Sequence, residues 1–245
     1  MDRAIYIAMT GAREVTRQQA AVAHNLANLS TTGFKSEMNV FRALPVVGEG
    51  APTRAFVLAT TPTTDYSSGV LQATGRNLDV AVNGPGWIAV RDASGQEAYT
   101  RMGDLQTSAN SVLQTGTGLT VQGDGGPIAI PPDQQILIGK DGTVSSVPVG
   151  QNQNTVTIAG RIKLVNPPEP DLVRGDDGLF RLKSGQPAPA DGNVTLAVGV
   201  LETSNVNPTD ALVRMISLGR QFDMQMRVLN AANEDHKNAD KIIAK

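Results

Sequence analysis

The sequence predicts an α+β fold in which long N- and C-terminal helices pair as an antiparallel, coiled-coil-like hairpin. An all-β domain, built as a barrel or sandwich, is inserted between them. Two observations predict this arrangement. Apolar residues recur every three to four positions at both ends of the 245-residue chain. Between these ends, the apolar runs are short and are separated by turns rich in glycine and proline.

The first helix is predicted from Ile5 to Leu29. Its apolar seam consists of Ile5, Ala8, Ala12, Val15, Gln19, Val22, Leu26 and Leu29. The alanines keep the seam thin, so a second helix can approach closely. Gly33 follows a run of hydroxyl residues and can adopt the left-handed backbone that stops a helix. A helix of this kind requires a partner to cover its seam.

The second helix is predicted from Pro208 to the C-terminal end. Asn207 is placed to act as N-cap, Pro208 occupies the first helical position and Asp210 lies in the first turn. At 1.5 Å per residue, about 36 residues of helix span about 54 Å. The seam of this helix consists of Leu212, Met215, Gly219, Phe222, Met226 and Leu229.

Short strands are predicted between the helices. They cover residues 78–82, 87–91, 97–102, 119–121, 136–138, 143–147, 155–165, 179–182 and 194–202. Trp87, the only tryptophan, is expected in their core, and residues 46–57 are expected to form a hairpin or irregular arm. The resulting domains are a helical domain (1–34 with 204–245), a connecting arm (35–75) and a β domain (76–203).

The composition excludes several classes of function. Hydrophobic residues make up 40% of the chain but aromatic residues only 4%, which favours thin or divided cores. A net charge of −2 provides no basic field for nucleic acid. No segment has the apolar length of a membrane span, and the first residues lack the pattern of a cleaved signal peptide. The absence of cysteine excludes disulfide and thiolate chemistry.

Catalytic and metal sites are not expected. His24 and His236 are the only histidines, and neither has a second ligand nearby in the sequence. Most acidic residues lie in Asp-Gly turns. We therefore expect neither an enzyme nor a bound cofactor or small-molecule substrate. The alternative is a secreted carbohydrate-acting β domain, which would require two carboxyl groups about 5 to 10 Å apart across a cleft.

Four blocks of sequence carry a resemblance to a known family. Asn25–Lys35 (NLANLSTTGFK) resembles the signature of the bacterial flagellar axial proteins of the rod and hook family. Residues 78–87, 99–103 and 201–207 are similar to further blocks of that family, in the same order. Two positions depart from the family pattern: His24 replaces an Asn, and Asp210 replaces a Glu.

The resemblance implies a structural role. It is strongest to the proximal rod members, with the distal rod or another axial protein as the alternative. The family's subunits pass through the flagellar type III export apparatus and stack helically with neighbouring proximal and distal rod subunits. Their terminal helices form the inner tube and their β domains the outer wall. The resulting basal-body rod crosses the periplasm and transmits torque.

The assembly interface is predicted from the two seams and the signature. A seam that one chain cannot cover is expected to be buried between subunits in a helical filament. The alternative is that the C-terminal seam folds back on the β domain. The amides of Asn25 and Asn28 are expected to bond to neighbouring subunits. The predicted interface residues are Ile5, Ala8, Ala12, Val15, Val22, Asn25, Leu26, Asn28, Leu29, Thr32, Gly33, Phe34, Leu212, Met215, Gly219, Phe222, Met226 and Leu229.

Overall fold

The computed structural model describes residues 2–45, 55–59, 63–132, 134–148 and 156–243. The described chain has one helix at each end and a β-rich middle, so the fold is α+β. It divides into two compact units. The helical unit consists of residues 1–29, 36–65 and 206–245, and the β unit of residues 30–35 and 66–205.

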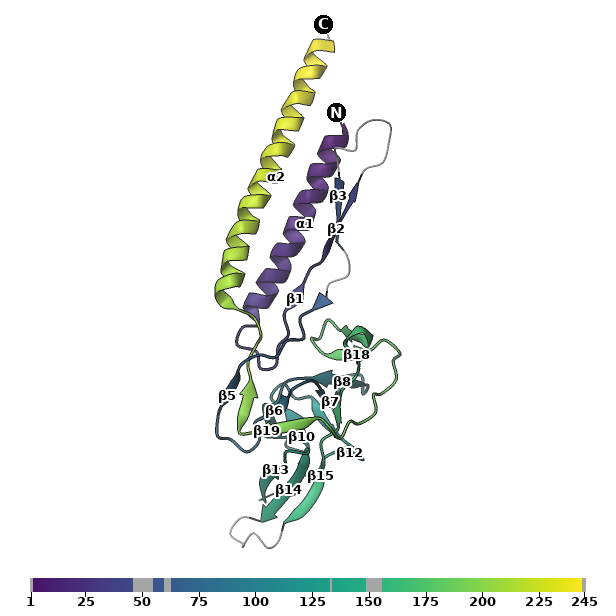
Figure 1. The fold of residues 1–245 in the computed structure, drawn as a ribbon, viewed down its shortest axis with the longest axis vertical. Coiled ribbons are helices and arrows are strands. Elements are labelled where there is room, and N and C mark those ends of the chain that lie inside the picture. The colour runs from purple at the N-terminus through teal and green to yellow at the C-terminus, as the bar shows by residue number, and fades with distance from the viewer. Residues whose placement is uncertain (1, 46–54, 60–62, 133, 149–155, 244–245) are drawn as a thin grey trace. The chain divides into compact units, whose positions relative to one another are not determined.

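Two long helices dominate the helical unit. Helix α1 (Asp2–Ala27) and helix α2 (Pro208–Ile243) pack against each other. The start of α1 and the end of α2 lie at the same end of this unit (Figure 1). The predicted cap of α2 is confirmed, because the side chain of Asn207 accepts hydrogen bonds from the backbone N–H groups of Thr209 (3.0 Å) and Asp210 (3.3 Å). Neither described helix is apolar over a stretch long enough to cross a bilayer.

Small residues allow the two helices to approach closely. Ala8 and Ala12 of α1 are buried, as is Ala211 of α2. At Gly11 of α1, an added Cβ would lie only 3.2 Å from the side chain of Gln225. The predicted thin seam is therefore the part of α1 on which close packing depends.

The end of α1 differs from the prediction. The helix ends at Ala27, and residues 28–33 form turns instead of continuing the helix to a glycine cap. Gly33 does adopt the left-handed conformation, with φ of 66°, but it does so several residues beyond the helix. Its conformation serves a close backbone contact within the β unit, described below.

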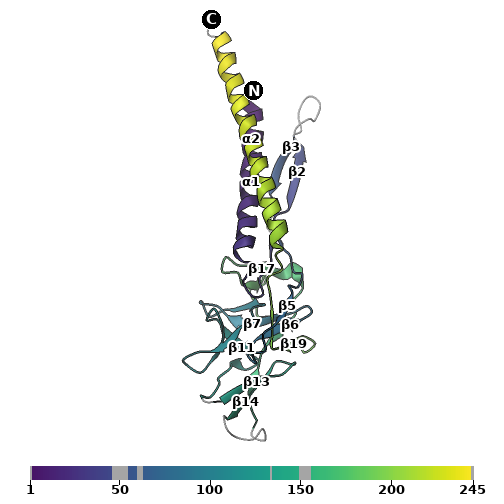
Figure 2. The ribbon, with the colours of Figure 1, turned by 90° about the vertical axis from the view of Figure 1, so that its left-hand side faces the viewer.

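Short strands complete the helical unit. Strands β2 (Phe41–Pro45) and β3 (Ala55–Ala59) pair antiparallel, and β3 contacts α1 (Figure 2). Strand β1 (Glu37–Met38) pairs with β4 (Thr63–Thr64). The expected hairpin at 46–57 coincides with the connection between β2 and β3, and its residues 46–54 lie outside the described part of the chain.

The β unit contains several antiparallel sheets, and its described strands close no barrel. The largest sheet has the order β17-β18-β8-β7-β11-β10-β9, with β12 paired to β11 and β16 paired to β7. Strands β13, β14 and β15 form a second sheet, and β19-β6 and β20-β5 form pairs. Their bounds are β5 (Leu71–Ala73), β6 (Val80–Asn83), β7 (Trp87–Arg91), β8 (Glu97–Thr100), β9 (Leu105–Thr107), β10 (Leu113–Thr115), β11 (Thr120–Gly123), β12 (Gly126–Pro127), β13 (Gln134–Ile138), β14 (Thr143–Pro148), β15 (Thr157–Arg161), β16 (Leu164–Val165), β17 (Leu172–Arg174), β18 (Phe180–Leu182), β19 (Thr195–Val198) and β20 (Val200–Glu202). A 3₁₀ turn (Glu169–Asp171) precedes β17.

The longer apolar runs predict observed strands correctly, whereas several strands of three residues were not predicted. Each predicted strand overlaps an observed one, but 155–165 is divided into β15 and β16. The run 194–202 is interrupted at Gly199, whose φ of 74° breaks the extended backbone. The three-residue strands β5, β9, β10 and β17 were not predicted, because they are too short to show alternation.

The core of the β unit is divided, as the low aromatic content indicated. One cluster is aliphatic and includes Val80, Ile88, Leu105 and Leu113. The other contains Trp87, Tyr99, Phe180 and Ala188, and the Trp87 and Phe180 rings lie 4.5 Å apart. The expected core position of Trp87 is confirmed, since its side chain is buried.

Candidate assembly surface and the junction of the signature blocks

Helix α2 has large apolar side chains that remain exposed although it packs against α1. The buried positions are Ala211 and Leu218, one residue away from the predicted Leu212 and Gly219. Leu212 remains 51% exposed, and Ile216 is 59% exposed. Of the other predicted seam residues, Met226 is exposed, whereas the half-buried ones are Met215, Gly219, Phe222 and Leu229. The seam is therefore real but is covered along one flank only.

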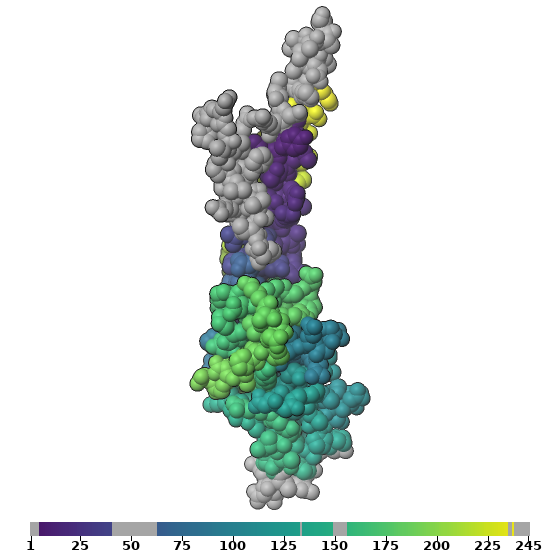
Figure 3. Space-filling view, turned by 90° about the vertical axis from the view of Figure 1, so that its right-hand side faces the viewer, coloured from purple at the N-terminus to yellow at the C-terminus, as the bar shows by residue number. Residues whose placement is uncertain are grey.

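Helix α1 is better covered, because its small residues face α2. Ala8, Ala12 and Val15 are buried. The remaining predicted positions, Ile5, Val22, Asn25, Leu26, Asn28, Leu29 and Thr32, are half-buried. Tyr6 is 62% exposed, and atoms of α1 (purple) reach the surface on the face shown in Figure 3. Both helices thus retain apolar side chains that the single chain does not bury.

The amides of the signature make hydrogen bonds within the chain, and the expectation that they also bond to neighbouring subunits stays a prediction. Asn25 donates from Nδ2 to the carbonyl of Glu37 (2.8 Å), and its Oδ1 accepts from the Glu37 N–H (2.9 Å). Asn28 donates to the carbonyl of His24 at 2.9 Å. The physical reason is that β1 runs beside the last turns of α1, and the Asn25 amide satisfies both backbone groups of Glu37.

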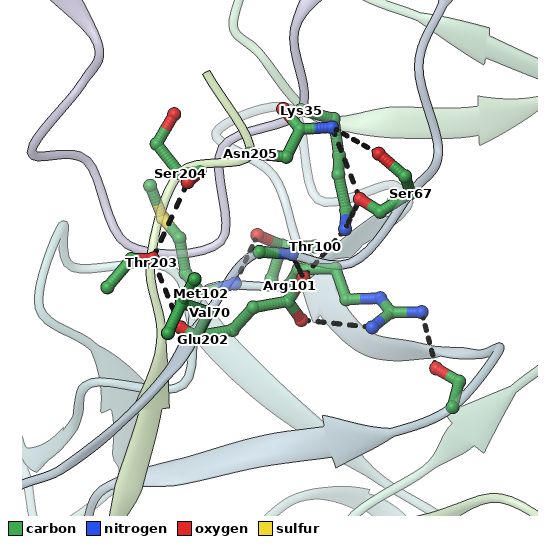
Figure 4. Close-up of polar contacts among 12 residues, drawn as sticks. Lys35, Ser67, Val70, Thr100, Arg101, Met102, Glu202, Thr203, Ser204 and Asn205 are labelled. Carbon is green, nitrogen blue, oxygen red and sulfur yellow. Dashed lines mark hydrogen bonds and ion pairs between the residues drawn. The ribbon is translucent and has the colours of Figure 1, made fainter. Parts of the chain in front are cut away.

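The signature blocks meet in a buried ion cluster inside the β unit (Figure 4). Lys35 Nζ lies 2.6 Å from Glu202 Oε1, and Arg101 Nη1 lies 2.9 Å from Glu202 Oε2. The side chains of Lys35, Arg101 and Glu202 are 0%, 4% and 1% exposed. One carboxylate therefore pairs with two cations that have almost no access to water.

Backbone groups complete the cluster. Lys35 Nζ also donates to the carbonyl of Ser67 (2.7 Å), and Arg101 Nη2 donates to the carbonyl of Gly84 (2.7 Å). The N–H of Gly69 donates to Glu202 Oε1 at 2.9 Å. Such partners are required, because buried charges are costly unless they are paired and hydrogen-bonded.

The cluster favours the ionised form of Glu202. Burial by itself would raise the pKa of this carboxyl group. The hydrogen bond from Lys35, the charge of Arg101 and the N–H of Gly69 outweigh burial, so the pKa of Glu202 lies below its usual value. The guanidinium of Arg101 also lies 5.4 Å from the centre of the Trp87 ring, a cation–π contact.

Gly33 and Phe34, two predicted interface residues, are buried inside this junction in the single chain. The N–H of Gly33 donates to the carbonyl of Glu202 (2.8 Å), and an added Cβ would lie 2.3 Å from the backbone of Arg101. Arg174 lies 4.7 Å from the Phe34 ring centre and donates to the carbonyl of Lys35. Gly33 is required here for two reasons: a Cβ would clash with the backbone of Arg101, and its φ of 66° is unfavourable for other residues. This is the role of the glycine that was interpreted as a helix stop.

Sequence reasoning missed the roles of Lys35, Arg101 and Glu202. A signal was nevertheless present. Lys35 is the only charged residue in the block 25–35, Arg101 the only one in 99–103, and Glu202 the only one in 201–207. Three otherwise uncharged blocks with two cations and one anion indicate mutual pairing.

Three family models of known proteins match separate parts of the chain. Residues 5–35 match the model "Flagella basal body rod protein", residues 81–146 match "Flagellar hook protein FlgE/F/G D1 domain", and residues 197–242 match "Flagellar basal body rod FlgEFG protein C-terminal". The three residues of the ion cluster, Lys35, Arg101 and Glu202, each lie within one of the matched ranges.

Flagellar basal-body rod proteins are also similar to this chain over nearly their whole length. The flagellar basal-body rod protein FlgF of Salmonella typhimurium and that of Escherichia coli K12 are each 43% identical to this chain, over 100% of it and 99% of the relative. The flagellar basal-body rod protein FlgG of Bacillus subtilis is 31% identical over 96% of each. The chain therefore belongs to the family of flagellar basal-body rod proteins and is FlgF-like within it.

Proposed function

We propose that this structural subunit of the flagellar basal-body rod, which is not an enzyme, assembles through the apolar side chains that its two helices leave exposed. The observation that carries the proposal is the exposed flank of α2, where Leu212 and Ile216 are more than half exposed. Large apolar side chains on one helix flank are typical of a surface that a partner covers.

In this proposal α1 and α2 act as an antiparallel, coiled-coil-like hairpin that lines the inner tube of the rod. The functional domains are residues 1–34 with 204–245, an arm at 35–75 and a β domain at 76–203 that forms the outer wall. The interface comprises the exposed and half-buried members of both seams. Gly33 and Phe34 support it from inside the β unit, because they are buried there.

The partners in this proposal are neighbouring proximal and distal rod subunits, which stack helically into a torque-transmitting shaft across the periplasm. The chain reaches this position through the flagellar type III export apparatus. A proximal position is supported by the 43% identity over the full chain to the FlgF relatives of Salmonella typhimurium and Escherichia coli K12.

The test is a charge placed on the exposed flank of α2. Ile216→Asp is expected to leave the monomer folded, because this side chain makes little intramolecular contact, and to block incorporation into basal bodies. Burying a carboxylate at each repeated contact costs several kcal/mol, on the order of a thousandfold in association. Incorporation and motility are measured in a strain that lacks its own copy.

The matched control is Ile158→Asp in β15, which replaces the same side chain where it is 70% exposed on the β unit. This variant is expected to retain incorporation. If Ile216→Asp builds motile flagella as well as the control does, the exposed flank of α2 is not the assembly surface.

A further inference from the structure

We propose that the ion cluster is the core of a force-bearing clasp that closes the base of the β unit. The clasp is defined as residues 33–35 and 202–205 together with Arg101. Residues 33–35 follow α1 in the chain, and residues 202–205 directly precede α2. The clasp is a property of the single chain and goes beyond the proposed assembly.

The connectivity of the chain gives the clasp its mechanical position. Lys35 and Glu202 are 167 residues apart in the sequence, yet their side chains are in direct contact. Among the described residues, strands β1 to β19 lie in the loop between them, and β20 ends at Glu202 itself. Tension applied at the two chain ends therefore passes from residue 35 to residue 202 through the clasp. While the clasp holds, the loop between these two residues does not lengthen.

The contacts of the clasp suit this position. Besides the ion pairs, the backbones of the two segments bond directly, from Gly33 N–H to the Glu202 carbonyl (2.8 Å) and from Asn205 N–H to the Phe34 carbonyl (3.3 Å). The side chain of Asn205 donates to the Ser67 carbonyl at 3.2 Å. Because the ion pairs are excluded from water, they are stronger and less screened than surface pairs.

A second ion pair provides a contrast inside the loop. Lys163 Nζ lies 2.8 Å from Glu97 Oε2, and both side chains are 16% exposed. Its geometry is similar to that of the clasp, but it joins two segments of the β unit that lie between residues 35 and 202. Removing it alters the β unit without altering the path that tension takes through the clasp.

The experiment pulls single full-length chains by handles at residues 1 and 245, at constant load. The wild type should first extend only by what residues 1–32 and 206–245 provide, at about 3.6 Å per residue. Opening of the clasp then exposes the loop, whose 167-residue separation corresponds to about 600 Å. Lys35→Met should raise the rate of clasp opening at fixed load by about tenfold or more, because it removes a charged hydrogen bond.

The control Lys163→Met should open the clasp within about twofold of the wild-type rate. Glu202→Gln should open it faster than Lys35→Met. If Glu202→Gln does not fold at zero load, as judged by the fluorescence of Trp87, Lys35→Met decides the test. The proposal is overturned if Lys35→Met opens at the wild-type rate, or if wild-type chains release part of the loop before the clasp opens. These outcomes are independent of whether α2 mediates assembly.

Discussion

Replacing Glu202 by Gln should destabilise the β unit more than removing either of its cationic partners. Glu202 is the anion that contacts both Lys35 and Arg101. The substitution keeps the shape of the side chain but removes the negative charge that these two buried cations share. Breaking a buried ion pair in this way typically costs about 3 to 5 kcal/mol.

Lys35→Met is the informative comparison. It leaves Arg101 and Glu202 as a neutral pair, so the expected cost is the loss of charged hydrogen bonds, about 1.5 to 3 kcal/mol. Lys163→Met, at a more accessible pair, should cost about 1 kcal/mol or less. The expected order of destabilisation is therefore Glu202→Gln, then Lys35→Met, then Lys163→Met.

The assay is urea unfolding followed by tryptophan fluorescence. The chain has one tryptophan, and Trp87 is buried in the β unit, so the signal reports on that unit specifically. The free energy of unfolding is obtained by linear extrapolation to zero urea. If Glu202→Gln costs no more than Lys35→Met, the argument that two buried cations depend on one carboxylate is wrong.

The pH dependence provides a second check on the same variant. The pKa of Glu202 is lowered in the folded state, because its hydrogen bonds and neighbouring cations outweigh burial. A carboxyl group with a lowered folded-state pKa contributes stability above its unfolded pKa, and this stability is lost as the pH falls through the folded-state pKa. The stability difference between wild type and Glu202→Gln should thus be constant near about pH 7 and shrink below about pH 4.5. A difference that grows on acidification would contradict this assignment.

Three further substitutions probe single contacts of the β unit, each by urea unfolding. Gly33→Ala should cost more than about 2 kcal/mol, since its Cβ would lie 2.3 Å from the backbone of Arg101. Gly95 also has a positive φ but lies in open space, so Gly95→Ala should cost only about 1 kcal/mol. Equal costs would contradict the contact argument. Asp104→Asn should stabilise the β unit by about 1 kcal/mol near neutral pH, because burial raises the pKa of Asp104 and its Oδ1 has no partner among the described residues. This gain should disappear below about pH 4, where the carboxyl group of the wild type is protonated in both the folded and the unfolded state. In the folded chain, the N–H of Ala188 donates to the phenol oxygen of Tyr99 at 2.7 Å. Tyr99→Phe leaves this N–H without its acceptor and should cost about 1 to 3 kcal/mol. A neutral effect would show that water replaces the phenol oxygen as acceptor.

The sequence by itself determined the elements whose signals are local. Both helices, the Asn207 cap and the longer strands follow from periodicity and from turn residues, which act over a few neighbouring positions. Asp141-Gly142, for example, marks the turn between β13 and β14, and Gly142 has φ of 85°. The resemblance of four blocks to the flagellar axial proteins also indicated the family, which the comparisons confirm.

Only the tertiary structure decided which residues meet across long separations. Asn25 bonds to Glu37, Gly33 serves a backbone contact rather than a helix cap, and Glu202 pairs with two distant cations. Periodicity indicates that a side chain faces a partner but contains no information on which partner lies there. The choice among distant residues depends on how the whole chain closes, since a buried charge such as that of Glu202 is costly unless the fold brings an opposite charge to it.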